Sequence, residues 1–191
     1  MALVEQNKEK GFLKKHVYAI HSSNNISLLQ RKIYNAMLFN ASYLETDQRK
    51  HTINLNDLSS LIGYDSKDFK KLKKSIRDLT IIPIDWNVIS ETDIKEVIEN
   101  TTAYLAGVQF KGNICTYEYA DILKEFLLKP AIYGKVYLKI QSQFKTSCGI
   151  ALYENCSRYK DVGYTPWIQV KTLGKLLGFD DTKLEIGRAH V

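Results

Sequence analysis

The sequence predicts an α+β fold, in which one complete structural unit is followed by the front half of a second. The 191 residues are 45% hydrophobic and 25% charged, which is the composition of a folded globular chain. Apolar residues recur at helical spacing in some segments and alternate in others, so helices and strands are mixed along the chain. A strand-and-helix pattern over residues 53–65 recurs over 168–180, always 115 residues later. Two copies at so long a period indicate a duplicated unit and not a solenoid.

The first element expected after a polar arm is a long helix. Ser27 and Gln30 form a capping box, in which the Ser27 hydroxyl accepts from a free backbone N–H and Gln30 reaches back. The apolar residues that follow cover a broad face, which predicts that the helix is largely buried. They are Leu28, Leu29, Ile33, Tyr34, Met37, Leu38, Ala41 and Leu44.

A short strand and a short helix come next. Ile53 and Leu55 alternate with polar residues, which predicts the strand. Asn54 or Asn56 caps the helix, and Gly63 ends it, because glycine readily adopts the left-handed conformation found at helix C-termini. The apolar residues of this helix are Leu58, Leu61 and Ile62.

The helix expected over residues 66–80 is the most basic part of the sequence, and Ser66 is its expected N-cap. At about 100° per residue, its apolar side chains form one stripe. That stripe consists of Phe69, Leu72, Ile76 and Leu79. The candidate DNA-binding residues lie opposite the stripe or beside it, and they are Lys67, Lys70, Lys71, Lys73, Lys74 and Arg77. A lysine-rich helix face is often only solvated, and that alternative stays open.

Three strand-like segments follow, at residues 81–86, 102–110 and 114–119. Gly112-Asn113 is a turn signal that joins the last two as a β-hairpin. The acidic stretch 85–99 is expected to be a loop or a sheet edge. A short helix over 120–128 is stopped by Pro130.

Helix, strand, helix, basic helix and β-hairpin is the order of elements in a winged helix-turn-helix. In that fold the basic helix is the recognition element and the hairpin is the wing. The sequence therefore predicts that residues 66–80 contact nucleic acid. Lysine is a flexible point charge, so we expect contacts to phosphates more than to bases. The net charge of +6 agrees with a polyanionic partner.

The repeat divides the chain into an N-terminal arm at 1–25, a winged helix at 26–134, a partial second winged helix at 135–182 and a tail at 183–191. The alternative is that any strand followed by a helix gives a similar apolar pattern. Glu185–Val191 resembles the in-frame translation of a common sequencing adapter, so we hypothesise that the tail is not native and the second unit is truncated. Leu152, Leu173 and Leu176 should then be less covered than Leu58.

Several functional classes lack their sequence signatures. There is no GxxxxGK[ST] phosphate loop and no HExxH motif, and the histidines are scattered at positions 16, 21, 51 and 190. The three cysteines form no CxxC pair, which fits a reducing cytoplasm. Cys148 and Cys156 can share a helix face, but two thiols without a nearby histidine are more often core residues than a metal site.

We also expect neither a membrane segment nor a secretory signal, because no apolar run approaches the roughly 18 residues that a span needs. The expectation is a cytoplasmic protein that is not an enzyme and that needs no metal and no cofactor.

Two segments resemble plasmid replication initiators of the iteron-binding, two-winged-helix family. They are Leu28–Asn35 and Cys148–Glu154, the second followed by Arg158-Tyr159 and Trp167-Ile168. The resemblance implies a DNA-binding protein that recognises repeated sites at a plasmid origin and helps to open the DNA. In the family, the first domain carries dimer contacts and the second makes most base-specific contacts.

The partners implied by this resemblance are double-stranded DNA, a second copy of the chain, and the host replication initiator and helicase. Initiators of this family also repress their own promoters. Two alternatives remain open from the residues alone. One is a winged-helix transcriptional repressor, and the other is a winged-helix protein–protein adaptor whose basic face meets an acidic partner.

Overall fold

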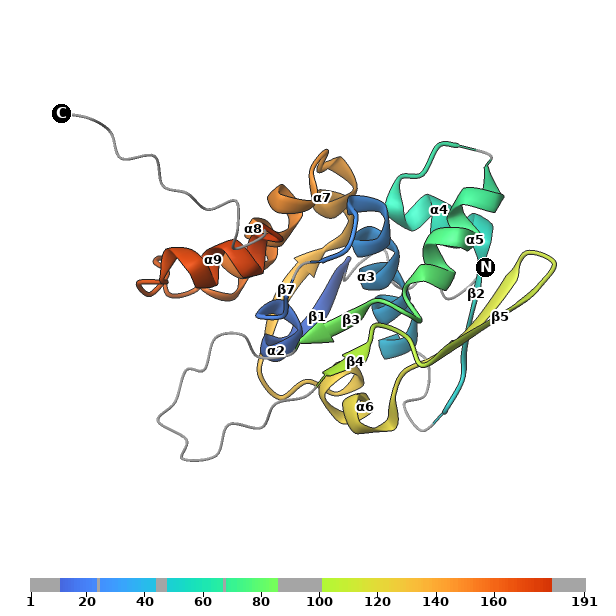
Figure 1. Ribbon diagram of the computed structural model, residues 1–191, viewed down its shortest axis with the longest axis horizontal. Coiled ribbons are helices and arrows are strands. Elements are labelled where there is room, and N and C mark those ends of the chain that lie inside the picture. Colours follow the sequence, from blue (N-terminus) through green and yellow to red (C-terminus); the bar gives the residue numbers. More distant parts are fainter. Residues whose placement is uncertain (1–10, 24, 44–47, 67, 86–100, 180–191) are drawn as a thin grey trace.

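The computed structural model describes residues 11–23, 25–43, 48–66, 68–85 and 101–179, and it confirms the α+β class (Figure 1). The first elements are β1 (Phe12–His16), α2 (Val17–Ile20), α3 (Leu28–Tyr43), β2 (His51–Asn54), α4 (Leu55–Ile62), α5 (Phe69–Asp78) and β3 (Pro83–Asp85). The later elements are β4 (Thr101–Ala103), β5 (Gly107–Lys111), β6 (Ile114–Glu118), α6 (Asp121–Leu128), β7 (Tyr133–Tyr137), α7 (Leu138–Gln143), α8 (Ser147–Arg158) and α9 (Val170–Leu177).

Helices α3, α4 and α5 together with a three-stranded sheet form a winged helix, as predicted. The sheet is antiparallel with the order β2-β6-β5, so the strand after α3 pairs with the second strand of the hairpin. β5 and β6 form the wing, joined at Gly112-Asn113. Gly112 has a φ of 60°, which favours glycine in this turn.

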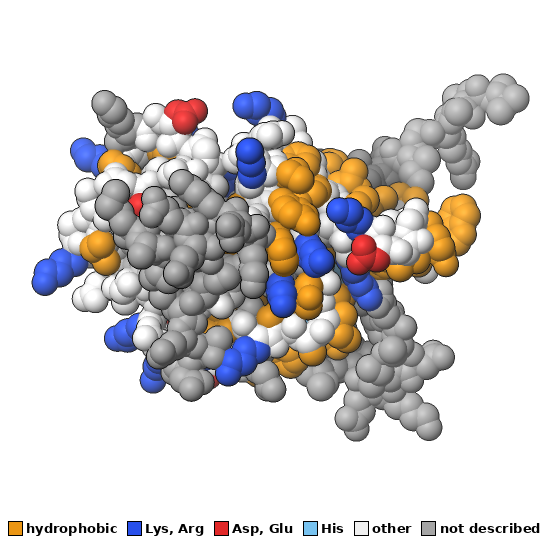
Figure 2. Space-filling view, turned by 180° about the vertical axis from the view of Figure 1, so that it is seen from behind, with side chains coloured by type: hydrophobic (Ala, Val, Ile, Leu, Met, Phe, Trp, Pro, Cys, Tyr) orange, Lys and Arg blue, Asp and Glu red, His pale blue; other side chains and the backbone are white. Residues whose placement is uncertain are grey.

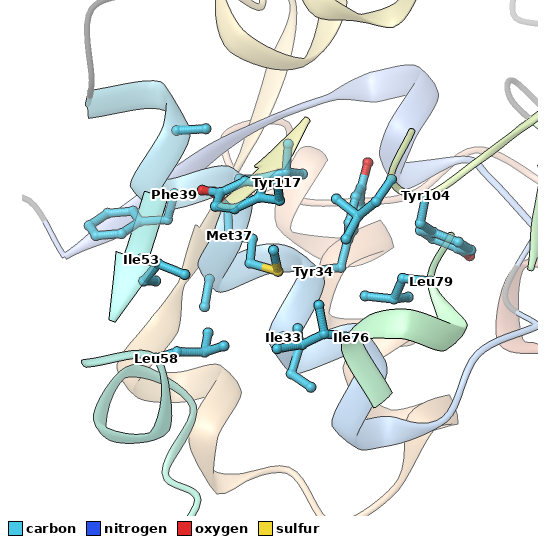
Figure 3. Packing of buried hydrophobic residues seen from close by; sticks show 14 of the residues in the cluster. Ile33, Tyr34, Met37, Phe39, Ile53, Leu58, Ile76, Leu79, Tyr104 and Tyr117 are labelled. Carbon is cyan, nitrogen blue, oxygen red and sulfur yellow. The ribbon is translucent and has the colours of Figure 1, made fainter. Parts of the chain in front are cut away.

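α3 lies at the centre of the core. Its capping box is confirmed: the Ser27 hydroxyl accepts from the Gln30 N–H at 3.3 Å, and the Gln30 side chain accepts from the Ser27 N–H at 2.8 Å. The buried face of α3 meets residues from β2, α4, α5 and β6 (Figure 3). Each such side chain contributes about 1.5–3 kcal/mol by leaving water. Those labelled in Figure 3 are Ile33, Tyr34, Met37, Phe39, Ile53, Leu58, Ile76, Leu79, Tyr104 and Tyr117.

The predicted polar arm is part of the fold from residue 12 onward, which corrects the expectation for residues 1–25. β1 pairs antiparallel with β7, so that Leu13 lies opposite Val136, and both are fully buried. Three consecutive polar residues, Lys14, Lys15 and His16, follow Leu13 in β1, and they concealed the strand because Lys15 is itself buried. The predicted boundary after residue 134 falls inside β7.

Gly134 marks a close crossing of three elements. A Cβ at this position would lie 2.7 Å from Cδ1 of Ile20 in α2 and 3.1 Å from Oγ of Ser157 in α8. The absence of a side chain therefore lets β7 pass directly over both helices.

The segment 102–110, predicted as one strand, forms parts of two strands. β4 pairs with β3, whereas β5 pairs with β6. Between them Leu105 is fully buried, and its N–H donates to the carbonyl of Leu79 just after α5 (3.1 Å). The chain thus turns into the core at Leu105, which separates the end of β4 from the start of β5. Residues 86–99 of the predicted acidic loop lie outside the described residues, and α6 ends before Pro130 as predicted.

α9 repeats α4 at the predicted offset. α4 covers residues 55–62 and α9 covers 170–177, and each ends at a left-handed glycine, Gly63 with φ 63° and Gly178 with φ 83°. Residues 165–169, which precede α9, form no strand, unlike β2 before α4. The helix and its end are therefore repeated, but the strand is not.

The burial of the partial second unit agrees only in part with the prediction. Leu152 is 45% exposed and Leu173 is half-buried, whereas Leu58 is fully buried. The prediction is wrong for Leu176, which is fully buried because α9 packs against α8. The tail at 183–191 and the adapter-like segment lie outside the described residues.

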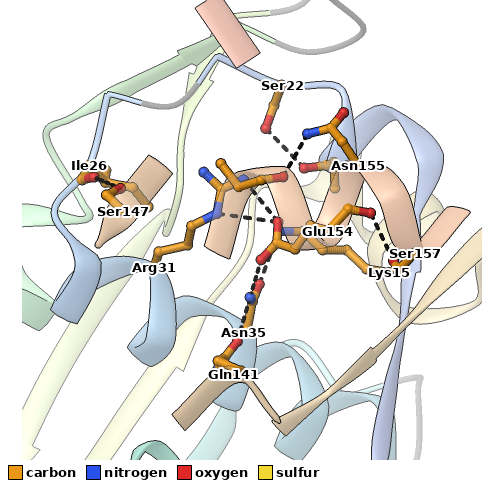
Figure 4. A network of polar contacts seen from close by, with 12 residues as sticks. Lys15, Ser22, Ile26, Arg31, Asn35, Gln141, Ser147, Glu154, Asn155 and Ser157 are labelled. Atoms are coloured by element: carbon orange, nitrogen blue, oxygen red, sulfur yellow. Dashed lines mark hydrogen bonds and ion pairs between the residues drawn. The ribbon is translucent and has the colours of Figure 1, made fainter. Parts of the chain in front are cut away.

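A buried polar network joins α8 to the first winged helix (Figure 4). One carboxylate oxygen of Glu154 accepts from Lys15 Nζ at 2.7 Å and from Arg31 Nη2 at 2.8 Å. The other oxygen accepts from the side-chain amide of Asn35, which also donates to Gln141 at 2.7 Å. The network therefore connects β1, α3, α7 and α8.

The charges in this network alter each other's ionisation. Burial alone would raise the pKa of Glu154, but the charges of Arg31 and Lys15 and their hydrogen bonds lower it to about 2. Burial lowers the pKa of Lys15 to about 8, although the carboxylate of Glu154 acts in the opposite direction. Glu154 is thus held ionised at neutral pH.

Candidate nucleic-acid interface

α4 and α5 form the helix-turn-helix that carries the basic residues. Asn54 is the N-cap of α4, since its side chain accepts from the Asn56 N–H at 2.9 Å. Of the two predicted caps, Asn54 is therefore the one used. Gly63 ends α4 in the left-handed region, which turns the chain toward α5.

The N-cap of α5 is Asp68, so the prediction of Ser66 is wrong. The Asp68 carboxylate accepts from the Lys71 N–H at 3.1 Å, and the Ser66 hydroxyl accepts from the Asp68 N–H at 3.1 Å. A carboxylate caps well because its charge also suits the positive end of the helix dipole. Ser66 instead supports the turn before the helix.

The apolar stripe of α5 fixes the orientation of the helix on the core. Leu72 and Ile76 are fully buried, as is Leu79 just after the helix, and Phe69 packs against them while partly exposed. This confirms the predicted stripe. Because the stripe faces inward, the opposite lysines face solvent.

Three of the six predicted contact residues, Lys70, Lys71 and Lys74, are exposed on this outer face. Lys74 forms an ion pair with Asp78 one turn later, at 2.9 Å. The described part of the chain gives the ammonium groups of Lys70 and Lys71 no carboxylate partner. Lys67 lies outside the described residues.

Lys73 and Arg77 are directed toward the wing and do not join the outer group. Lys73 Nζ lies 5.5 Å from the centre of the Phe110 ring, and Arg77 Cζ lies 5.0 Å from it. Lys73 also donates to the carbonyl of Gly112 at 2.9 Å. The five described candidates therefore do not form a single surface.

Two exposed polar side chains of the wing, Gln109 and Lys111, were not identified from the sequence. They lie on β5 beside the hairpin turn, on the strand that also carries Phe110. The signal was present as a polar residue on each side of Phe110 before a Gly-Asn turn. A winged helix places such residues beside the recognition helix.

The described ranges hold no group of three His, Cys, Asp or Glu side chains that could bind a metal ion. Cys156 is exposed and Cys148 is partly exposed, whereas Cys115 is buried and burial raises its pKa to about 12. Among the helices described, none is both long enough and apolar enough to cross a membrane.

The three helices, the sheet order and the hairpin define a winged-helix protein. The family model for the initiator replication protein, WH1, matches residues 12–157, and the chain therefore belongs to this family. This confirms the expectation of a DNA-binding initiator of plasmid replication.

Solved structures give further similarities. The Pi initiator protein in complex with iteron DNA is 13% identical, with a TM-score of 0.59 over 88% of this chain and 73% of that chain. At this identity the likeness shows the fold. Domains 2 and 3 of RctB are 14% identical, with a TM-score of 0.49 over 84% of this chain and 64% of that chain. A comparison with curated protein sequences found no significant match.

Proposed function

We propose that this initiator binds double-stranded DNA at repeated sites of a plasmid origin, and that the outer face of α5 contacts the phosphates. The observation that carries the proposal is the exposure of Lys70, Lys71 and Lys74 on the second helix of a helix-turn-helix. The Pi initiator, which has a similar fold, was crystallised with iteron DNA. That complex supports a DNA partner for the same fold here.

The outer face of α5 supplies affinity and register more than sequence choice. Its side chains are lysines, and an ammonium group is a point charge without the planar fork that reads guanine. The guanidinium of α5, that of Arg77, lies against Phe110. Base-specific contacts are therefore assigned to other parts of the protein, as in the family resemblance.

We further propose that the protein forms a homodimer and contacts the host replication initiator and helicase. It would also repress its own promoter, and it would be located in the cytoplasm. The proposed role is one of binding, without a catalytic step.

A salt titration of DNA binding tests the proposed face. Lys70→Ala and Lys74→Ala should each weaken binding to all DNA sequences alike, because phosphates are common to all of them. If each lysine contacts one phosphate, the slope of log affinity against log salt should become shallower by roughly 0.9. Fluorescence anisotropy with an origin duplex and a random duplex measures both quantities.

Lys129→Ala is the matched control, because it removes the same charge from an exposed site that follows α6, outside the helix-turn-helix and the wing. It should leave the affinity and the slope unchanged. If Lys70→Ala and Lys74→Ala behave like this control, α5 is not the DNA face. The adaptor alternative, in which the basic face meets an acidic protein, would then be favoured.

A further inference from the structure

Two of the cations of α5 contact the wing, and both approach the same side chain of the hairpin, that of Phe110. Lys73 and Arg77 lie one turn apart and both approach the ring of Phe110, at 5.5 and 5.0 Å from its centre. A cation within about 6 Å of an aromatic ring is attracted to the electron-rich face of the ring. Lys73 is also partly buried, unlike the outer lysines.

The turn of the wing is held from two sides. On one side the Gly112 carbonyl accepts from Lys73 Nζ at 2.9 Å, and on the other the Asn113 carbonyl accepts from the Leu55 N–H at 2.8 Å. The second contact uses the backbone of α4 and is independent of side-chain identity. The hydrogen bond from Lys73 to Gly112 depends on a side chain of α5, so a substitution in α5 can remove it.

From this geometry we infer that Lys73 and Arg77 are positioning residues, which hold the wing against α5 and do not contact DNA phosphates. The inference rests on the proposed function for its effect on binding. The two helices of the helix-turn-helix and the wing then form one unit, in which the direction of Lys111 relative to Lys70 is set before DNA arrives. Such preorganisation lowers the ordering cost of binding.

The first test uses amide hydrogen exchange of the wing, residues 107–114, in the absence of DNA. Lys73→Gln and Arg77→Gln should each accelerate exchange there by about two- to fivefold, the factor expected for loss of an exposed cation–π contact. Phe110→Leu should do the same. Lys73→Arg retains the cation and should behave like the wild type. Lys70→Gln, which removes a charge from the same helix but not from the wing, is the matched control.

The second test uses the salt dependence of duplex binding. Lys73→Gln should lower affinity by about the same two- to fivefold factor and leave the salt slope unchanged. Lys70→Gln should make the slope shallower by roughly 0.9. Unchanged exchange in both Lys73→Gln and Arg77→Gln, or a shallower salt slope for Lys73→Gln, would overturn the inference. Failure of Lys70→Gln to alter binding would instead count against the proposed DNA face, and the exchange measurement would still decide the role of Lys73 and Arg77.

Discussion

Glu154 illustrates how much one buried charge can control in this protein. Its side chain is completely buried, and both of its cationic partners, Lys15 and Arg31, are almost completely buried as well. Taking a carboxylate and two cations out of water is costly, and the cost is offset only while each charge is matched. Loss of the carboxylate would leave two buried positive charges side by side.

We therefore predict that Glu154→Gln lowers the free energy of unfolding by about 3–5 kcal/mol, the range for a broken buried ion pair. Urea denaturation followed by circular dichroism measures the change. Glu118→Gln is the control, because Glu118 forms a partly exposed ion pair with Arg49 at 3.5 Å. It should cost no more than about 1 kcal/mol. Equal effects of the two substitutions would show that burial of Glu154 has no special consequence.

At the scale of elements, α4 and α9 are the same helix in two environments. Leu58 and Leu173 occupy the same position, 115 residues apart, but Leu58 is fully buried whereas Leu173 is half-buried. The difference arises because α4 packs against α3 and α7, and α9 packs against α8. Equivalent leucines therefore contribute different amounts to the free energy of unfolding in the two copies.

Alanine substitution at the two positions should reveal that difference. Leu58→Ala should cost about 2–5 kcal/mol, because it opens a cavity in a closed core. Leu173→Ala should cost about 1–2 kcal/mol, since a half-exposed side chain removes less area from water on folding. Chemical denaturation of both variants provides the comparison. A larger effect at Leu173 would contradict the burial described for α9.

The elements that could be predicted from the sequence are those whose causes are local. A capping box, an apolar stripe and a terminal glycine involve neighbours in the chain, and α3, α4 and α9 begin or end accordingly. β1 was missed because its partner, β7, is distant in sequence and because its buried Lys15 looks like a solvent-exposed residue.

The candidate DNA-binding site could also be predicted only where its causes are local. Helical geometry correctly separated the buried stripe of α5 from its outer lysines. It could not show that Lys73 and Arg77 meet Phe110, because the place of the wing is set by the pairing of β6 with β2. Contacts between elements need the tertiary structure.

At the scale of the whole molecule, the same buried carboxylate predicts how stability depends on pH. The pKa of Glu154 is about 2 in the folded protein, below its ordinary value of 4.5. Ionisation of Glu154 therefore contributes stability that is fully present above about pH 4.5 and is lost as the pH falls toward 2. The difference between the two pKa values corresponds to about 3 kcal/mol.

Acid titration of the unfolding free energy measures this contribution. Between pH 4.5 and 2 the wild type should lose more stability than Glu154→Gln, which has no carboxyl group at this position to protonate. Other carboxylates titrate in the same range in both proteins, so only the difference between the two curves is diagnostic. Parallel curves would mean that Glu154 has an ordinary pKa in the folded state.

The pairing of Lys15 with Glu154 also sets the order of events on the ribosome. The two residues lie 139 positions apart in the chain. At a synthesis rate of roughly 5–20 residues per second, Lys15 is made roughly 7–28 s before its counter-charge. During that interval the nascent chain carries two cations whose later burial requires a carboxylate that has not yet been made. β1 can therefore pair with β7 as soon as β7 has been made, but the charge of Lys15 is matched only after translation has passed Glu154 in α8.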